Sequence, residues 1–306
     1  MSGDDLRLSP ARIGAFGNAD KLYGTPEQRR LALADDMGLH NVLGYEAAFA
    51  DQSVGVDFLR PESPYHHLKT LATEVYGDVF DPHLNTVPDD AAALDAGCGI
   101  GRFTLSLAER FATVTAFDPC RAALNCAARH VAKSGRDNIN LLHGDLAGLT
   151  DLPAATFDVV FAVELFCYTA APERAALQLF RLARPGALLF ASVEALPGAL
   201  SGVSLPGPDA VTAALAGEPM LVPGDRYVRY FDRAALAELV TQAGFEIIEV
   251  FDAHFFAEGP LWQALDENRL ADPAYRLQIR EAERACRADL RLHNFARATG
   301  VVARKA

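Results

Sequence analysis

An apolar run at residues 91–96 predicts a buried strand that leads directly into a glycine-rich turn. The spacing of apolar residues over 102–110 predicts a helix after this turn. A second apolar run, rich in β-branched residues, occupies residues 112–117 and ends at Asp118. A strand, a glycine turn, a helix and another strand in this order predict an α/β fold whose ligand site lies at the turn.

The glycine turn and the acid before it favour a ligand with a cationic amino group over a dinucleotide. Gly97, Gly99 and Gly101 allow the backbone to bend tightly and to approach a ligand closely. The helix that follows offers free N–H groups at its N-terminus, as dinucleotide sites also do. Asp95 separates the two classes, because a carboxylate attracts a cationic amino group and repels a pyrophosphate.

The run Asp95-Ala-Gly-Cys-Gly-Ile-Gly101 resembles the first motif of the class I S-adenosylmethionine-dependent methyltransferases. Segments that resemble the family's later strands follow in order, at residues 112–119, 138–146, 157–164, 182–192, 229–250 and 300–304. The resemblance covers about residues 90–195 and 228–306, and the occurrence of these segments in order makes it specific. It implies an α/β, Rossmann-like doubly wound sheet of seven strands in the order 3-2-1-4-5-7-6, with the seventh strand antiparallel.

The resemblance also implies a cofactor, S-adenosyl-L-methionine, with S-adenosyl-L-homocysteine as product. The cofactor-binding residues that it implies are Asp95, Gly97, Cys98, Gly99 and Gly101 around the methionine part, Asp118 and Pro119 at the ribose, Asp145 and Leu146 at the adenine, and Glu164 near the methyl group. A single aspartate at a strand end more often caps the next helix. Three of them at adjacent parallel strand ends converge on one crevice, which favours a nucleoside-type ligand.

Catalytic residues are weakly marked in this family, so the candidates come from position and chemistry. Tyr168 follows the fourth strand, where it could steer the methyl acceptor or simply pack under a lid. His67 and His254 are candidate bases, because histidine titrates near neutral pH. In a quinone-biosynthesis O-methyltransferase branch, Glu-x-x-Glu-His at this point helps to bind a divalent metal. Here Cys167 and Tyr168 replace two of these ligands, and we therefore predict no metal.

Segments outside the core should determine the substrate. Residues 1–85 predict a helical arm or cap with helices near 27–37, 41–51 and 64–79, in a pattern that is broken at Pro26, Pro61, Pro64 and Pro82. Residues 86–306 would form the methyltransferase domain, with an irregular lid at about 195–227 that holds one helix near 209–216. A second insertion, at about 253–296, predicts helices over 260–270 and 273–292. Three elaborations on one rim favour an enclosed pocket for a small molecule.

Composition narrows the class of partner. The chain has 40 acidic and 28 basic residues and a net charge of −12, which argues against nucleic acid. Arginines between Arg276 and Arg291 alternate with acids, which predicts a solvated helix face. The chain contains no run of about 18 apolar residues, so the sequence predicts no membrane span. The N-terminus shows no secretory signal, and five cysteines without a CxxC pair favour a reduced, cytoplasmic protein.

These observations predict an enzyme that transfers a methyl group from S-adenosylmethionine to O, N or C of a small molecule. A secondary metabolite or a quinone-type aromatic is the favoured acceptor, and assembly into a homo-oligomer stays open. One alternative is a cofactor-binding protein that was repurposed for another reaction or for a non-catalytic role. Another is a nicotinamide-dependent oxidoreductase, against which Asp95 and the predicted seventh strand argue.

Overall fold

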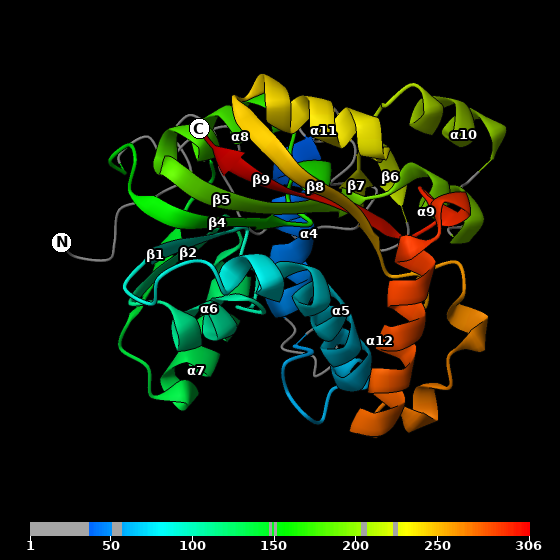
Figure 1. Cartoon of the computed structure of the whole chain (residues 1–306), viewed down its shortest axis with the longest axis horizontal. Helices are drawn as coiled ribbons and strands as arrows, with labels where there is room; N and C mark the ends of the chain where they lie inside the picture. Colours follow the sequence, from blue (N-terminus) through cyan, green and yellow to red (C-terminus); the bar gives the residue numbers. More distant parts are fainter. Residues whose placement is uncertain (1–36, 51–56, 147–148, 150–151, 203–206, 223–225) are drawn as a thin grey trace.

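The computed structural model describes residues 37–50, 57–146, 149, 152–202, 207–222 and 226–306. A seven-stranded sheet crosses the molecule, with helices on both faces (Figure 1). Its strands are β1 (Ala92–Ala96), β2 (Thr113–Asp118), β3 (Ile139–His143), β4 (Phe157–Val163), β5 (Ala183–Glu194), β8 (Phe245–Ala253) and β9 (Ala298–Lys305).

The strand order is β3-β2-β1-β4-β5-β9-β8. Since β8 and β9 are the sixth and seventh strands of this sheet along the chain, the predicted order 3-2-1-4-5-7-6 is confirmed. Strand β9 runs antiparallel to both β5 and β8, while the other neighbouring pairs are parallel. All strands except β9 therefore have their carboxyl ends at one edge of the sheet, and β9 begins at that edge.

Helices cover the two faces of the sheet in separate layers (Figure 1). One layer contains α5 (His66–Leu84), α6 (Thr104–Arg110) and α7 (Arg121–Ser134), and the other contains α8 (Pro172–Leu182) and α11 (Arg233–Gln242). Buried residues of α8 and α11 form one core with the sheet, and those of α5 and α6 form another. The division at residue 85 stays a prediction, although α5 packs directly on the sheet through Val75 and Phe80.

The described parts of the elaborations contain more regular structure than the pattern indicated. The predicted second helix of the N-terminal segment is present as α4 (Met37–Ala50), and the first, near 27–37, lies almost wholly outside the described residues. After β5 come α9 (Leu196–Gly202) and α10 (Pro208–Leu215), which matches the helix predicted near 209–216. A hairpin of β6 (Met220–Val222) and β7 (Arg226–Val228) replaces the irregular lid that was expected there.

Three local predictions are wrong. Pro82 does not end α5, because the helix continues to Leu84. The helix predicted over 260–270 is instead two short 3-10 turns, η3 (Trp262–Ala264) and η4 (Glu267–Arg269). The arginines of α12 (Pro273–Ala288) do not form a wholly solvated face: Arg276 and Arg280 pair with Glu74 and Asp78 of α5.

Within the described part of the chain, no helix is both long enough and apolar enough to cross a lipid bilayer.

Candidate active site

The candidate site lies at the carboxyl edge of the sheet, where open α/β sheets bind ligands. Four strands place an acid at or just after their carboxyl ends: Asp95 in β1, Asp118 in β2, Glu164 after β4 and Glu194 in β5. His254 follows β8 and Arg297 precedes β9, so both meet the same edge. The topology thus gathers residues that lie up to 202 positions apart in the sequence.

The glycine turn folds back on the end of β2. The N–H groups of Gly97 and Cys98 both donate to the Phe117 carbonyl, at 2.9 and 3.0 Å. Gly99 has a φ of +54°, which favours glycine, and a Cβ placed there would meet nothing within 4 Å. The backbone of the turn is therefore open to a ligand at Gly99. The Cys98 side chain is buried beneath the turn as a free thiol.

Asp95 is a buried carboxylate with one protein hydrogen bond. Thr104 Oγ1 donates to its Oδ2 at 2.6 Å. Burial raises the pKa of Asp95 to about 6, against the effect of this hydrogen bond. A carboxylate kept from water in this way is stabilised by a cation, and a cationic ligand would supply one.

Asp118 holds the adjoining turns in place. Its Oδ2 accepts from Gly99 N and its Oδ1 from Cys120 N, both at 2.8 Å. Burial raises the pKa of Asp118 to about 6 despite these two bonds. A carboxylate has about four lone-pair sites, so two remain for ligand hydroxyl groups.

The end of β3 lies next to this turn. Gly144 N donates to the Asp118 carbonyl at 3.2 Å, and His143 Nε2 contacts the Pro119 carbonyl at 3.0 Å. Asp145 and Leu146 follow at once, half-buried, and Leu146 packs against the core. The geometry therefore puts the residues predicted for ribose and adenine beside one another.

Helix α4 covers this edge. Glu46 accepts from the N–H groups of Arg121 and Ala122 at the start of α7. Asn41 bonds both backbone groups of Tyr227 in β7, at 2.7 and 2.8 Å. The helix is thus tied to the ribose-side turn at one point and to the hairpin at another.

A network of half-buried charges surrounds Glu164. Tyr76 Oη and Arg297 Nη1 each donate to Glu164 Oε1 at 3.2 Å, and Arg102 Nη1 lies 4.0 Å from the same oxygen. Burial alone would raise the pKa of Glu164, but Arg297, Arg102 and Lys69 together lower it below its usual range. Glu164 is therefore an anion at neutral pH, in a left-handed backbone conformation with φ 55°.

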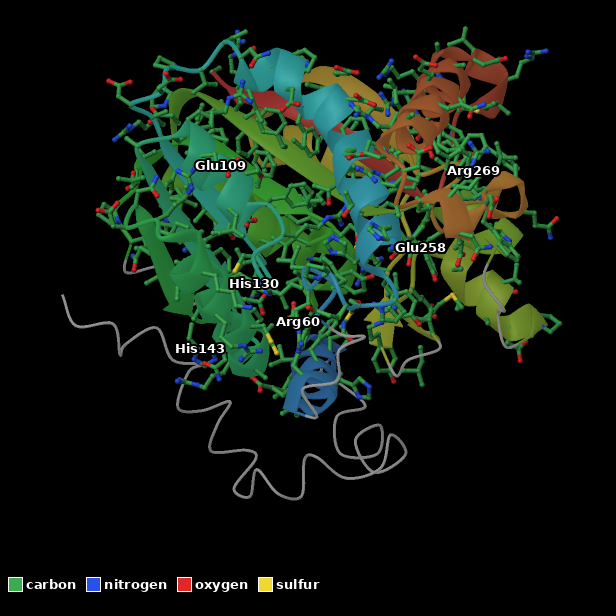
Figure 2. All side chains as sticks on the ribbon, turned by 90° about the horizontal axis from the view of Figure 1, so that it is seen from below. Arg60, Glu109, His130, His143, Glu258 and Arg269 are labelled. Atoms are coloured by element: carbon green, nitrogen blue, oxygen red, sulfur yellow. The ribbon has the colours of Figure 1, made fainter. Side chains whose placement is uncertain are left out.

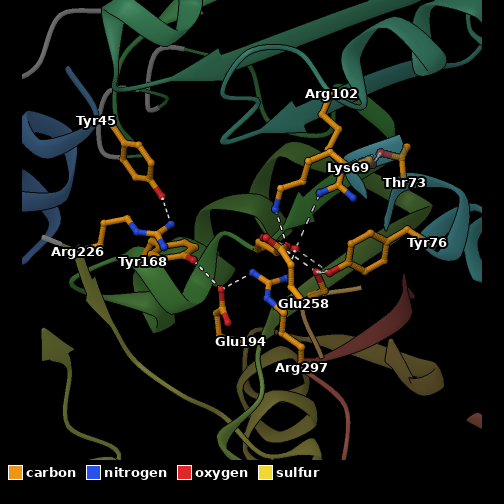
Figure 3. Close-up of polar contacts among 12 residues, drawn as sticks. Tyr45, Lys69, Thr73, Tyr76, Arg102, Tyr168, Glu194, Arg226, Glu258 and Arg297 are labelled. Atoms are coloured by element: carbon orange, nitrogen blue, oxygen red, sulfur yellow. Dashed lines mark hydrogen bonds and ion pairs between the residues drawn. The ribbon is translucent and has the colours of Figure 1, made fainter. Parts of the chain in front are cut away.

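Two further cations complete the network. Lys69 Nζ donates to Glu258 Oε2 at 2.6 Å. Arg102 Nε donates to Thr73 Oγ1 at 2.8 Å, while its Nη2 is buried and has no hydrogen-bond partner within the described ranges. Figure 3 shows Lys69, Arg102 and Tyr76 on one side of the cluster.

Tyr168 belongs to the opposite side of the cluster (Figure 3). Its hydroxyl donates to Glu194 Oε1 at 2.8 Å, and Arg297 Nη2 donates to the same oxygen at 2.7 Å. Burial and then the charge of Glu194 raise the pKa of Tyr168 well above 10.0. Tyr168 is therefore a neutral phenol that can donate a hydrogen bond and is unsuited to act as a base.

His254 is the only one of the two predicted histidine bases that reaches the cluster. Its ring is fully buried, packs edge-on against Tyr76 at 4.5 Å between centroids, and has no hydrogen-bond partner at either nitrogen in the described structure. Burial, followed by the charge of Arg297, lowers the pKa of His254 well below 6.5. Nearby, the buried Glu283 accepts from Phe255 N and Phe256 N and holds the turn after β8.

His67 lies elsewhere. It is exposed, and nine positions separate it from Tyr76 on α5, about two and a half helical turns. The two side chains therefore point in opposite directions. His130 and His143 are also remote from Glu258 (Figure 2); His130 Nε2 instead contacts Asp57 at 2.7 Å.

Several residues of the site were not predicted from the sequence. They are Lys69, Arg102, Glu194, Arg226, Glu258 and Arg297. For Glu194 and Arg297 a signal existed, since one ends the fifth strand and the other precedes an antiparallel seventh strand.

Comparisons with known proteins agree with this fold. A family model described as "Methyltransferase domain" matches residues 94–191. The ubiquinone biosynthesis O-methyltransferase of Methylocella silvestris is 30% identical over 182 residues, which cover 53% of this chain and 68% of that protein. The protein of the same name from Aromatoleum aromaticum is 26% identical over 193 residues, 62% of this chain and 77% of that one.

Among solved structures, the methyltransferase of a Haloferax volcanii complex with a methyltransferase activator is 17% identical, with a TM-score of 0.51. The match covers 85% of this chain and 96% of that one, and it supports the fold alone. The chain belongs to the class I S-adenosylmethionine-dependent methyltransferases. It is accordingly a methyltransferase enzyme.

Proposed function

We propose that this enzyme binds S-adenosylmethionine at the carboxyl edge and transfers its methyl group to an oxygen of a small molecule. The observation that carries the proposal is the pair of buried carboxylates, Asp95 and Asp118, on either side of the open backbone at Gly99. The choice of oxygen is supported by the relatives, which are named O-methyltransferases.

The residues present suit the proposed cofactor. Asp95 would bind the cationic amino group, and Asp118 has free lone pairs for the ribose hydroxyls. Arg102 Nη2, a buried donor without a partner within the described ranges, would bind the methionine carboxylate. The cofactor supplies a methyl group on a sulfonium, whose neutral thioether is a good leaving group. Asp145 and Leu146 would contact the adenine.

The chain's own task is to position the acceptor and keep water away. Tyr168 would either keep its one hydroxyl proton on Glu194, which it already contacts, or turn that proton to the acceptor. His254 would take the proton of the acceptor hydroxyl: its imidazole is neutral at pH 7 because burial lowers its pKa, and the same low pKa makes it a weak base. His67 has no place in this proposal, since it lies on another face of α5.

The acceptor side is built by three elaborations that meet in one cluster. Tyr45 comes from α4, Arg226 from the β6–β7 hairpin, and Glu258 from the segment between β8 and β9 (Figure 3). This enclosure supports a small molecule as the methyl acceptor, with a hydroxylated aromatic favoured by the aromatic side chains of the cluster. No nucleic acid is proposed, because the net charge of −12 opposes it.

The test combines cofactor binding with product analysis. Calorimetry with S-adenosylhomocysteine should show binding that Asp118→Ala weakens by about 1–3 kcal/mol, the usual effect of losing a charged hydrogen-bond partner. Mass spectrometry of catechols incubated with the enzyme and cofactor should show the gain of one CH₂ unit. His254→Gln should slow this transfer by about 10²-fold, the lower end of general-base effects because its pKa is low, and leave cofactor binding unchanged. Cofactor binding with no methylated product from any acceptor would contradict the proposed methyl transfer.

His83→Gln serves as the matched control for His254→Gln. His83 lies near the end of α5, where its Nε2 contacts Glu249 at 2.9 Å, and it has no contact with the buried cluster. Equal loss of activity in both variants would show that His254 matters only for stability.

A further inference from the structure

The cations at the acceptor side outnumber the carboxylates. Lys69 pairs with Glu258, and Arg297 lies between Glu164 and Glu194. Arg102 is next to Glu164. Arg226 is a fourth cation, and it forms no ion pair with a carboxylate in the part of the chain that the structure describes.

Arg226 is held by aromatic rings. Its Nη1 donates to Tyr45 Oη at 3.2 Å, and the centre of its guanidinium lies 6.0 Å from the Tyr45 ring and 5.8 Å from the Tyr168 ring. The side chain is half-buried, so water screens its charge only in part. The next residue in β7, Tyr227, is fixed to Asn41 by two hydrogen bonds, which gives Arg226 a rigid base.

Glu194 acts on Arg226 through its charge, but the two side chains form no ion pair in the described part of the chain. Glu194 Oε1 already accepts from Tyr168 and Arg297, two donors that converge on one oxygen. The Arg226 guanidinium lies between the Tyr45 hydroxyl and the Tyr168 ring (Figure 3). A guanidinium presents a planar fork of donors, and a carboxylate is the anion that matches it in geometry.

We infer that Arg226, flanked by Tyr45 and Tyr168, binds a carboxylate group on the methyl acceptor. The inference rests on the proposed function and narrows its substrate to a planar aromatic acid. The tyrosine rings contact the ring of the acceptor, and the guanidinium fork binds its carboxylate. The cofactor does not compete for this cation, because its own carboxylate is assigned to Arg102.

Calorimetry on the enzyme saturated with S-adenosylhomocysteine tests this inference. The probes are 3,4-dihydroxybenzoate and its methyl ester, which share the ring and both hydroxyls but differ in charge. The wild type should bind the acid about 10- to 100-fold more tightly than the ester, as expected for a charge-assisted hydrogen-bonded pair. Arg226→Gln should remove this preference by weakening the acid alone, and Arg226→Lys should retain part of it.

Arg184→Gln is the matched control. Arg184 lies at the amino edge of β5, where it pairs with Asp158, and the variant should retain the full preference for the acid. Unchanged binding of the ester and of S-adenosylhomocysteine by Arg226→Gln excludes a merely structural role. Failure of the wild type to bind the acid, equal affinities for both probes, or a preference that survives Arg226→Gln would overturn the inference. Preference for the acid without methylated product would contradict the proposed function and leave the carboxylate site standing.

Discussion

Backbone strain at the residue scale gathers where the candidate chemistry lies. Five described non-glycine residues have positive φ, and three of them, Glu164, His254 and Glu258, belong to the cluster around Glu164. Such conformations cost about 1–3 kcal/mol each and persist only where the surroundings impose them. For His254 the surroundings include Arg297 N, which donates to its carbonyl at 3.1 Å, and the turn held by Glu283. The site is therefore maintained at the expense of stability.

Asp95 offers a direct test of whether the candidate site lowers the stability of the folded chain. Its pKa of about 6 in the folded state exceeds the ordinary 3.8, so the folded state binds more protons between these values. The free energy of unfolding therefore falls as pH rises from about 4 to 6, and the Asp95 anion destabilises the folded state at neutral pH. Without cofactor, Asp95→Asn should raise the free energy of unfolding at pH 7.5 by about 1–3 kcal/mol and change nothing at pH 3.

Urea unfolding at both pH values measures this difference, with the exposed Asp90→Asn as a control that should leave stability unaltered. The variant should also bind S-adenosylhomocysteine more weakly. An Asp95→Asn protein less stable than wild type at pH 7.5 would show that the carboxylate is already compensated inside the protein.

The residues that could be predicted from the sequence are those whose role follows from their position on one strand. Asp95 and Asp118 end strands that the apolar pattern marks clearly. Lys69 and Glu258 form an ion pair across 189 positions, and no local pattern indicates which acid a lysine will meet. The contact of Arg226 with Tyr45 of α4 likewise forms only in the folded chain, where the hairpin lies next to that helix.

At the scale of elements, α12 is fixed to α5 by charges at the interface. Asp78 of α5 is nearly buried and pairs with Arg280 and Arg284 of α12, while Arg276 pairs with Glu74. The alternation of charges along α12 was interpreted as solvated because its partners lie about 200 positions away. Helix α12 also carries Glu283, which holds the turn after β8, so its docking supports the position of His254.

Asp78→Ala should therefore destabilise the protein more than a surface change. Loss of the hydrogen bonds from Arg280 and Arg284 should lower the free energy of unfolding by about 1–2 kcal/mol, toward the lower end because both arginines are partly exposed. Burial raises the pKa of Asp78, but the two arginines lower it overall. The contribution is thus present above about pH 4 and is lost as pH falls below it.

Asp81→Ala is the matched control on the same helix. Asp81 is 63% exposed and lies 3.4 Å from Arg110, so its removal should change stability by less than about 0.5 kcal/mol. Denaturant unfolding at pH 7 compares the two variants. Equal effects would mean that the α5–α12 contact depends on its apolar residues alone.

The order of the sheet could be predicted because the motifs at successive strand ends resemble those of a family that implies this order. The ends of the helices were harder to predict. Pro82 removes one backbone donor two residues before α5 ends, where little of the helix remains to be broken. Residues 260–270 have helical spacing, but Gly259 approaches the His254 carbonyl so closely that a Cβ would lie 1.9 Å from it. This constraint comes from the tertiary structure and leaves no trace in the local pattern.

At the scale of the whole molecule, the topology of the sheet explains why three elaborations converge. The sheet has a single carboxyl edge, and each elaboration either follows a strand there or crosses it. Tyr45, Arg226 and Glu258 consequently meet although they come from three separate segments. Helix α4 then links this acceptor side to the ribose side through Asn41 and Glu46.

Cofactor binding should therefore stabilise the whole chain in a manner that depends on pH. At 100 times the dissociation constant a ligand adds about 2.7 kcal/mol to the free energy of unfolding. Asp95 and Asp118, each with a pKa of about 6, are ionised above that pH and can bind the amino and hydroxyl groups of S-adenosylhomocysteine. The rise in melting temperature at fixed ligand concentration should be full at pH 7.5 and should shrink as pH falls through 6, because protonation removes the charge. In Asp95→Asn the rise should be smaller at pH 7.5 and should vary less with pH. A rise in the wild type that is constant from pH 8 to pH 5 would show that neither carboxylate binds the ligand as an anion.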